Sequence, residues 1–283
     1  MSRFAHAGIQ GLTKMQLADG CRPFMRTADV IQFGSDATRT GMISTPAAAK
    51  LLPLLESLER PKQMRGVVEM FARAVGESAA QSFVADLVSY RILVPVRQRR
   101  VLILGNCELS RHLREQLDAA GVEHRSPVRG ESLGKFLLSN DPWMPLAIVN
   151  APLKLAELAI EAKHRRGLIL PVQQLDARVT VGPVCGVGGP CLMCVHLHHM
   201  DRDPNWEKIA ARVPFGGPAD PAALGAGAAA SAVVLRRLVG LPDPPGVSAP
   251  EPRPGTVTVV DPFGPEPVAR AQVPQHPDCP LCF

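Results

Sequence analysis

The sequence predicts an α/β protein with two domains, a small winged-helix-like domain at residues 22–96 and a Rossmann-type domain at residues 101–283. In the first part, three short β-type stretches are followed by three stretches of helical periodicity. In the second part, apolar strands alternate with amphipathic helices, as is typical of a doubly wound sheet. Two Cys-x-x-Cys pairs in the second part predict a structural metal site within that domain.

Turn residues and the spacing of apolar side chains define the elements of the first domain. Ser44 or Thr45 is expected to cap the first helix, with Pro46 just inside its start. Residues 1–20 show no periodicity and are expected to form a loose arm. The expected strands are 23–26, 29–34, 39–43 and 92–94, and the expected helices are about 45–58, 64–75 and 79–90.

Residues 98–100 are expected to link the two domains, and the second begins with an unbroken apolar run at Val101–Leu104. Such a run predicts a buried parallel strand. The stretch Leu241–Gly255 carries six prolines and is expected to be a surface loop or linker. The other expected strands are 122–125, 146–150, 168–172, 178–183, 256–261 and 268–273, and the expected helices are about 108–120, 155–166 and 218–240. A turn entering a helix is expected over 191–200, and Asp203 is expected to cap a further helix with Pro204 at its first position and Trp206 inside.

The charge pattern argues against nucleic acid as a partner. The net charge is only +5, from 31 basic and 26 acidic residues, and no long run of Lys or Arg could track phosphates. The predicted helix Ala79–Tyr90 contains Asp86 and no basic residue, so it lacks the face of a DNA-reading helix. No signal pattern and no apolar stretch of about 18 residues is present, so we expect no membrane segment and a cytoplasmic protein.

The two Cys-x-x-Cys pairs are Cys191/Cys194 and Cys279/Cys282. One such pair supplies two thiolates from a single tight turn, and two pairs make a closed tetrahedral site for zinc. A site with four thiolates has no open position, so this zinc would be structural. A redox pair and a disulfide are the alternatives. In a further alternative, Cys185 competes with these four cysteines as a metal ligand or is a reactive thiol.

The turn after the first Rossmann strand departs from a nucleotide-binding fingerprint. It has Gly105 but places Cys107 and Ser110 where further glycines would admit a phosphate. The second strand ends in His124-Arg125, with no carboxylate for a ribose. We therefore expect no ATP on this chain. The roles of three histidines that follow Cys194 stay open, including a second metal or catalytic role: His196, His198 and His199.

The run from Pro190 to Trp206, PCLMCVHLHHMDRDPNW, and the later Gln275-His276-Pro277-Asp278-Cys279 carry a family resemblance. They closely resemble the leader-peptide-binding proteins of thiazole/oxazole-modified microcin (TOMM) clusters, the ThiF-like partners of YcaO-type cyclodehydratases. The resemblance covers about residue 22 to the end. Residues 22–96 resemble the RiPP recognition element of that family. The Cys279/Cys282 spacing departs from a shorter one that is frequent there.

The resemblance implies a degenerate ThiF-like second domain and a role as a non-catalytic accessory subunit. Its partners would be the leader of a ribosomal precursor peptide and a YcaO-type cyclodehydratase; whether it forms a homodimer is left open. The alternatives are an active ThiF-like adenylating enzyme and a winged-helix DNA-binding regulator. Strand 39–43 would be an open edge for the peptide, with helix 79–90 opposite and Arg39, Lys50 and Arg91 available to acidic leader residues. The expected peptide-binding residues are Arg39, Thr40, Gly41, Met42, Ile43, Phe83, Leu87 and Tyr90.

Overall fold

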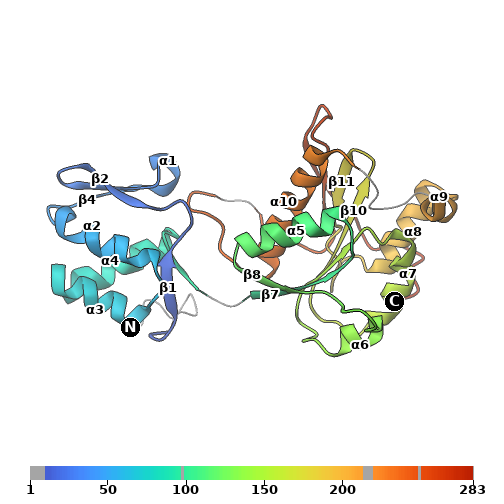
Figure 1. Cartoon of the computed structure of the whole chain (residues 1–283), viewed down its shortest axis with the longest axis horizontal. Coiled ribbons are helices and arrows are strands. Elements are labelled where there is room, and N and C mark those ends of the chain that lie inside the picture. Colours follow the sequence, from blue (N-terminus) through green and yellow to red (C-terminus); the bar gives the residue numbers. More distant parts are fainter. Residues whose placement is uncertain (1–9, 97–98, 213–218, 248–249, 283) are drawn as a thin grey trace. The chain divides into compact units, whose positions relative to one another are not determined.

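In the computed structural model the chain folds into two compact units (Figure 1). The structure describes residues 10–96, 99–212, 219–247 and 250–282. The first unit is Met1–Arg97 with Pro242–Pro250, and the second is Gln98–Leu241 with Glu251–Phe283. The first unit therefore takes in part of the proline-rich stretch that the sequence predicted only as a loop or linker.

The first unit contains two three-stranded sheets, ordered β5-β1-β6 and β2-β3-β4, and three main helices. The expectation of a loose arm over residues 1–20 is wrong for Lys14–Leu17, because this segment forms β1 with Met15 and Leu17 buried. The element bounds are β1 Lys14–Leu17, β2 Pro23–Thr27, β3 Val30–Phe33, α1 Ala37–Thr40, β4 Met42–Ser44, α2 Ala48–Glu56, β5 Lys62–Gln63, α3 Met64–Val75, α4 Glu77–Ser89 and β6 Leu93–Pro95.

The predicted strand 39–43 is only partly correct, because Ala37–Thr40 forms the short helix α1 and the strand β4 begins at Met42. Asp36 caps α1 by accepting a hydrogen bond from the Thr38 N–H at 3.1 Å. Gly41 ends the helix at a φ of 84°, a conformation that glycine adopts without steric cost. Because Asp36 and Gly41 cap both ends, Ala37–Thr40 is helical despite its β-type sequence pattern.

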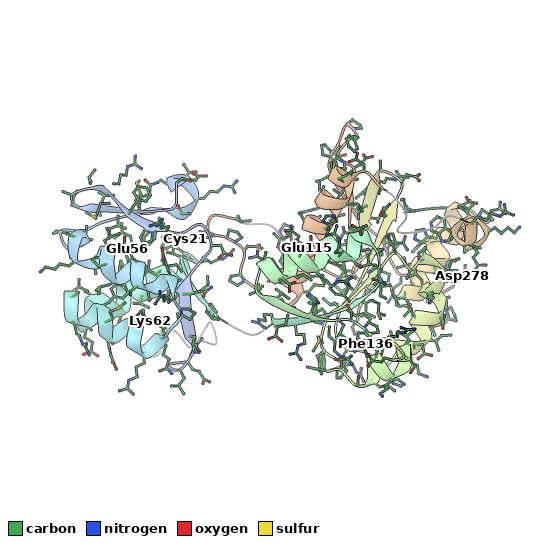
Figure 2. The ribbon with its side chains drawn as sticks, viewed as in Figure 1. Cys21, Glu56, Lys62, Glu115, Phe136 and Asp278 are labelled. Carbon is green, nitrogen blue, oxygen red and sulfur yellow. The ribbon has the colours of Figure 1, made fainter. Side chains whose placement is uncertain are left out.

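Helix α3 organises the core of the first unit. Its buried residues Met64, Val67 and Phe71 recur at helical spacing. The sequence predicted Val67, Val68, Phe71 and Val75 as inward, and Val68 and Val75 are only half-buried. Phe71 meets Phe83 of α4 edge-to-face, with ring centroids 5.1 Å apart. Cys21 is also fully buried in this core, and Phe136 is fully buried in the core of the second unit (Figure 2). Such side chains carry the stability of each unit through burial of apolar area.

The second unit is built on a seven-stranded sheet of order β13-β12-β11-β10-β9-β7-β8. Strands β8, β7, β9 and β10 are parallel, and β11 to β13 are antiparallel additions. The α/β prediction is confirmed. Arg99 and Arg100, expected in a linker, begin β7, and Gln98 lies outside the described residues. The bounds are β7 Arg99–Leu104, α5 Glu108–Ala119, β8 Val122–Arg125, α6 Leu133–Leu138, β9 Leu146–Val149, α7 Leu155–Glu161, β10 Ile169–Leu175, β11 Arg178–Val181, α8 Leu192–Arg202, α9 Trp206–Arg212, α10 Pro221–Leu238, β12 Thr256–Val260 and β13 Val268–Gln272.

Helices cover both faces of this sheet (Figure 1). Alternate residues of β7 enter separate cores, because successive side chains on a strand point to opposite faces. Val101 and Ile103 pack with α5 and α10, whereas Leu102 and Leu104 pack with α6, α7 and α8. None of the helices in the described part of the chain is long and apolar enough to cross a membrane.

Candidate functional site

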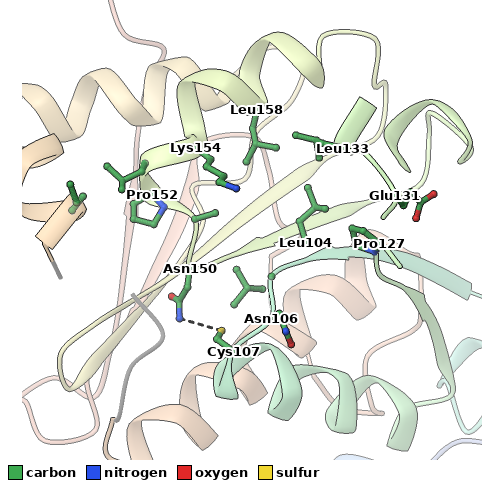
Figure 3. Close-up of a pocket in the computed structure, with 16 residues that line it drawn as sticks. Leu104, Asn106, Cys107, Pro127, Glu131, Leu133, Asn150, Pro152, Lys154 and Leu158 are labelled. Carbon is green, nitrogen blue, oxygen red and sulfur yellow. Dashed lines mark hydrogen bonds between the residues drawn. The ribbon is translucent and has the colours of Figure 1, made fainter. Parts of the chain in front are cut away.

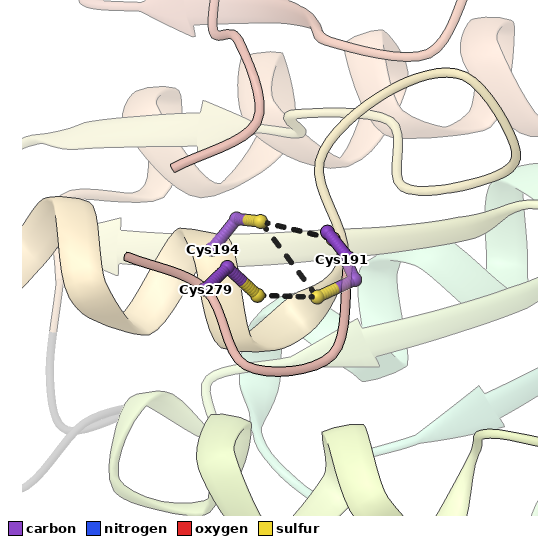
Figure 4. Close-up of side chains that lie close together, drawn as sticks. Cys191, Cys194 and Cys279 are labelled. Atoms are coloured by element: carbon purple, nitrogen blue, oxygen red, sulfur yellow. Dashed lines mark hydrogen bonds between the residues drawn. The ribbon is translucent and has the colours of Figure 1, made fainter. Parts of the chain in front are cut away.

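The four predicted cysteines come together in the second unit. Cys191 is the N-cap of α8 and Cys194 lies in its first turn, while Cys279 and Cys282 follow β13. The Cys191 Sγ lies 3.7 Å from Cys194 Sγ and 3.5 Å from Cys279 Sγ, and Cys194 Sγ lies 3.4 Å from Cys282 Sγ. Three of these side chains point toward one another in Figure 4. All four sulfur atoms lie within 4.8 Å of one another.

This geometry fits a tetrahedral metal ion. Four thiolates at the usual zinc–sulfur distance of about 2.3 Å lie about 3.8 Å from one another, close to the separations found here. All four are free thiols, so the structure gives no support to the disulfide alternative. The cluster can therefore hold an ion such as zinc. Because the protein fills every position, the ion would be structural and would cross-link α8 to the segment after β13.

The surroundings of Cys191 and Cys282 oppose their ionisation. Burial raises the pKa of Cys191 to about 11, and burial also raises the pKa of Cys282. Burial acts in the same direction on Cys194, but hydrogen bonds from the backbone of His276 and Cys191 outweigh it and lower the pKa of that thiol. Deprotonating all four thiols in this partly buried place would need a positive ion among them.

Cys185 is not part of the cluster. It is buried, its Sγ donates to the Pro183 carbonyl at 3.3 Å, and burial raises its pKa well above the usual range. A raised pKa opposes formation of a reactive thiolate at Cys185. The geometry favours the other four cysteines as ligands, because only their sulfur atoms form the cluster.

The histidines after Cys194 have structural partners. His198 Nε2 lies 3.0 Å from the Pro274 carbonyl, and His199 stacks on Trp206 with centroids 4.6 Å apart. His196 faces Glu207 at 3.5 Å. These contacts tie α8 to α9 and to the segment after β13.

A fourth histidine, His276, supports the cysteine cluster. It is 4% exposed, and its Nδ1 accepts the Asp278 N–H at 3.1 Å. Nε2 must then carry the proton that is donated to Asp201 Oδ2 at 2.8 Å. His198, Asp201 and His276 are close enough together to suggest a second metal site. However, this tautomer leaves His276 without a lone pair for a metal. The Cys279 N–H donates to the His276 carbonyl at 3.1 Å, so this histidine helps to position the second cysteine pair.

A cavity of about 570 Å³ lies at the carboxyl ends of β7 and β9, where nucleotides bind to folds of this type (Figure 3). The start of α5 is occupied by a local capping box. The Cys107 N–H donates to Ser110 Oγ at 3.0 Å, and this hydroxyl donates back to the Cys107 carbonyl at 2.8 Å. The Cys107 N–H at this helix start is therefore already bonded to a side chain.

Other residues of this cavity serve packing and local contacts. A side chain at Gly105 would place its Cβ 2.6 Å from the Val149 carbonyl, so the glycine serves the packing of β7 against β9. Asn150, at a φ of 51°, donates to Cys107 Sγ at 3.4 Å and accepts the Gln174 N–H at 2.8 Å. Glu131, which lines the cavity, is paired with Arg125 of β8 at 2.7 Å. The absence of ATP stays a prediction.

Another cavity, of about 500 Å³, lies in the first unit between the α1–β4 segment and α4. The structure brings all eight predicted peptide-binding residues around this groove, and their role in binding stays a prediction. Met42 and Tyr90 are 51% and 70% exposed there. Sequence reasoning missed Thr38, Asp86 and Ile92, which also line it. Asp86 of α4 lies one helical turn before Tyr90, the residue that ends the helix, and this spacing could have identified it.

Strand β4 offers an open edge to this groove. Among the described residues it pairs only with β3. The Phe33 N–H donates to the Gly41 carbonyl and the Thr45 N–H donates to the Asp29 carbonyl, on either side of the Ile31–Ile43 pair. Hydrogen-bonded pairs alternate in an antiparallel ladder. Ile43 therefore bonds to β3, and Met42 and Ser44 direct their N–H and C=O groups outward.

Comparison with known proteins places this architecture. No family model matches the chain, and no curated protein matches it in sequence. A heterocyclase solved in complex with substrate and cofactor has a TM-score of 0.60 at 14% identity, over 95% of this chain and 39% of that chain. The heterocyclase TruD has a TM-score of 0.58 at 14% identity, over 95% and 43%. E. coli MccB with MccA covers 95% of this chain and 99% of that chain, with a TM-score of 0.49 at 9% identity.

The two heterocyclases therefore share a fold with this chain, and the chain spans about two fifths of their length. The likeness extends over both units, because 95% of this chain is covered.

Proposed function

We propose that this chain is a leader-peptide-binding scaffold. It captures a ribosomal precursor peptide and presents it to a YcaO-type cyclodehydratase, which forms azolines. The observation that carries the proposal is the open edge of β4 facing α4 across a groove of about 500 Å³. An extended peptide can add to such an edge as a further strand. The fold shared with a heterocyclase solved with its substrate supports the same proposal.

Backbone and side chains would divide the work of recognition. The outward N–H and C=O groups of Met42 and Ser44 would pair with the peptide backbone, which supplies affinity without regard to sequence. Phe83 and Leu87 of α4, and Tyr90 directly after it, would receive apolar side chains of the leader. These three residues lie at helical spacing along one face of α4 and its end, so they can contact successive side chains of one bound strand.

Cationic side chains near the groove would add selectivity for acidic leaders. Arg39 lies 3.7 Å from Asp36, and both side chains are more than half exposed, so this ion pair is weak and open to exchange. Lys50 is exposed on α2. Asp86 lines the groove and would disfavour an acidic side chain at its own position. The leader that fits is therefore amphipathic, with apolar residues toward α4 and carboxylates toward Arg39.

The second unit would act as a non-catalytic partner surface. The two heterocyclases are more than twice as long as this chain, and we infer that a separate YcaO-type enzyme supplies the rest. Zinc at Cys191, Cys194, Cys279 and Cys282 would hold the fold together rather than take part in chemistry. An adenylating enzyme is the second candidate, because a cavity of about 570 Å³ remains at the nucleotide position.

The test uses the full chain and the precursor peptide encoded in its own gene cluster. Fluorescein-labelled synthetic peptides covering the N-terminal half of that precursor are titrated against the chain by fluorescence polarisation. Saturable binding by one peptide, and loss of binding when its order is scrambled, are expected. Pyrophosphate exchange with ATP, measured on the chain alone, would instead favour the adenylating enzyme. Light scattering after size-exclusion chromatography with the YcaO partner gives the stoichiometry.

A further inference from the structure

The segment Pro242–Val247, which we call the brace, belongs to the first unit although α10 before it and β12 after it belong to the second. Proline-rich stretches between elements are commonly solvated linkers. In this one Pro245 is buried, whereas Pro244 and Gly246 on either side of it are exposed. The brace is therefore docked on the first unit and does not behave as a free linker.

Its first contact is with the wall of the groove formed by α1 and β4. Gly246 has a φ of +68°, and a Cβ built on it would lie 2.7 Å from the Arg39 Cα and 2.8 Å from the Arg39 carbonyl oxygen. Backbone thus packs on backbone, and only glycine fits. Arg39 is itself one of the residues that line the groove.

Its second contact is with the opposite wall. Arg91 follows the end of α4, and its Nη1 donates to the Val247 carbonyl at 3.1 Å. Arg91 has a φ of 58°, a conformation that favours glycine and costs other residues about 1 kcal/mol. Its neighbours Tyr90 and Ile92 line the groove. A strained arginine at a position suited to glycine points to a use for its side chain.

We propose that the brace is part of the peptide-binding site, and that it sets the spacing of the two groove walls for an extended peptide. It ties Arg39 on one wall to Arg91 on the other at the end where β4 begins and α4 ends. None of its described residues lines the cavity, so it acts on the walls and leaves the groove open. This proposal rests on the proposed function, since the ligand is the same peptide.

The main test variant is Arg91→Gly, because it separates a binding role from a merely structural one. Glycine relieves the positive φ, so the melting temperature should stay equal or rise. Loss of the hydrogen bond to the brace should nevertheless weaken binding of the fluorescein-labelled leader peptide about 5-fold. Opposite directions for stability and affinity would not follow if Arg91 only stabilised the fold.

Gly246→Val disrupts the other contact, and Gly130→Val is its matched control. Gly130 also has a positive φ, of +84°, but a Cβ there would meet nothing within 4 Å. Hydrogen–deuterium exchange of residues 37–44 should become faster in Arg91→Gly and Gly246→Val and stay unchanged in Gly130→Val. This readout needs no peptide.

Unchanged exchange of residues 37–44 in both brace variants would overturn the proposal, whether or not the peptide binds. Faster exchange with an unchanged dissociation constant would also overturn it, because the walls would then move without affecting the ligand. A wild-type chain that binds none of the peptides refutes the proposed function instead, and the exchange rates then decide whether the brace holds the walls.

Discussion

Cys191 and Cys279 are 88 positions apart in the sequence, yet their sulfur atoms lie 3.5 Å apart. One closes the start of a helix, and the other follows the last hairpin of the sheet. This contact brings together two segments that are far apart in the sequence. Its stability should depend on whether a metal ion is bound between the sulfur atoms.

We predict about one zinc ion per chain, because four thiolates fill a tetrahedral site. Cys194→Ser should lose the metal and destabilise the second unit strongly, since structural zinc contributes on the order of 10 kcal/mol to folding in small domains. Cys185→Ala is the control and should keep the metal. Elemental analysis of the purified variants measures this. Metal-free wild-type protein in which all four thiols react with a thiol reagent would refute the prediction.

We predict that the chain alone neither binds nor hydrolyses ATP. The Cys107–Ser110 capping box ties up the helix start, and Arg125 and Glu131 pair with each other instead of with a ribose. Isothermal titration calorimetry with ATP and magnesium should show no heat of binding at micromolar concentrations. A clear isotherm would bring the adenylating enzyme to the front, and Gly105→Ala would then test whether the ligand occupies this cavity.

We predict that prolines in β4 act according to the direction of the N–H that they remove. Met42→Pro and Ser44→Pro remove outward donors, so each should weaken leader binding about 5-fold with little change in melting temperature. Ile43→Pro removes a donor to β3 and should lower the melting temperature. Gly41 cannot serve in this series, because its φ of 84° does not suit proline. Fluorescence polarisation and thermal unfolding give both readouts.

The result that would contradict this placement is equal leader binding by wild type, Met42→Pro and Ser44→Pro. Met42→Leu is the control for the side chain, since it keeps the N–H and changes only the sulfur that Arg26 contacts at 3.1 Å.

We predict that His199 stays neutral to unusually low pH. Burial first, and then the nearby Arg202, lower its pKa from 6.5 to about 4. Because the folded pKa lies below the unfolded one, the neutral ring stabilises the fold above pH 6.5, and this contribution is lost as the pH falls toward 4. The advantage of wild type over His199→Gln in urea unfolding should therefore shrink between pH 7 and pH 5.

Fluorescence gives an independent reading of the same group. The chain has two tryptophans, and Trp206 stacks on His199, so Trp143→Phe leaves one reporter. Protonation of the imidazole should quench Trp206 near pH 4. Quenching with a midpoint near 6.5 would show that burial does not shift this pKa.

Much of the fold follows from local patterns. The helix Met64–Val75 has the predicted bounds, because its apolar spacing and the glycine after it are both sequence-local signals. The two cysteine pairs could also be recognised as metal ligands from the sequence, because the two ligands of each pair are only three residues apart. The likeness to the two solved heterocyclases is one of fold.

Other features depend on contacts between distant residues and could not be predicted. Lys14–Leu17 has too few residues for a visible period, and its strand exists because β5 and β6 flank it. Asn150 adopts a positive φ because its side chain bonds to Cys107 and Gln174, which lie on other elements. The docking of Pro245 and Gly246 is a tertiary contact that a proline-rich composition conceals.

The two-part makeup of the first unit bears on how this protein could be recombined with others. A gene fusion that transplants residues 10–96 into a foreign enzyme would leave Arg91 without the Val247 carbonyl and Arg39 without Gly246. A chimera that keeps the brace but exchanges residues 10–96 would place the brace against a different backbone. Swaps should therefore carry both stretches together, and homologous exchange with a single crossover between them is expected to give poorly matched hybrids.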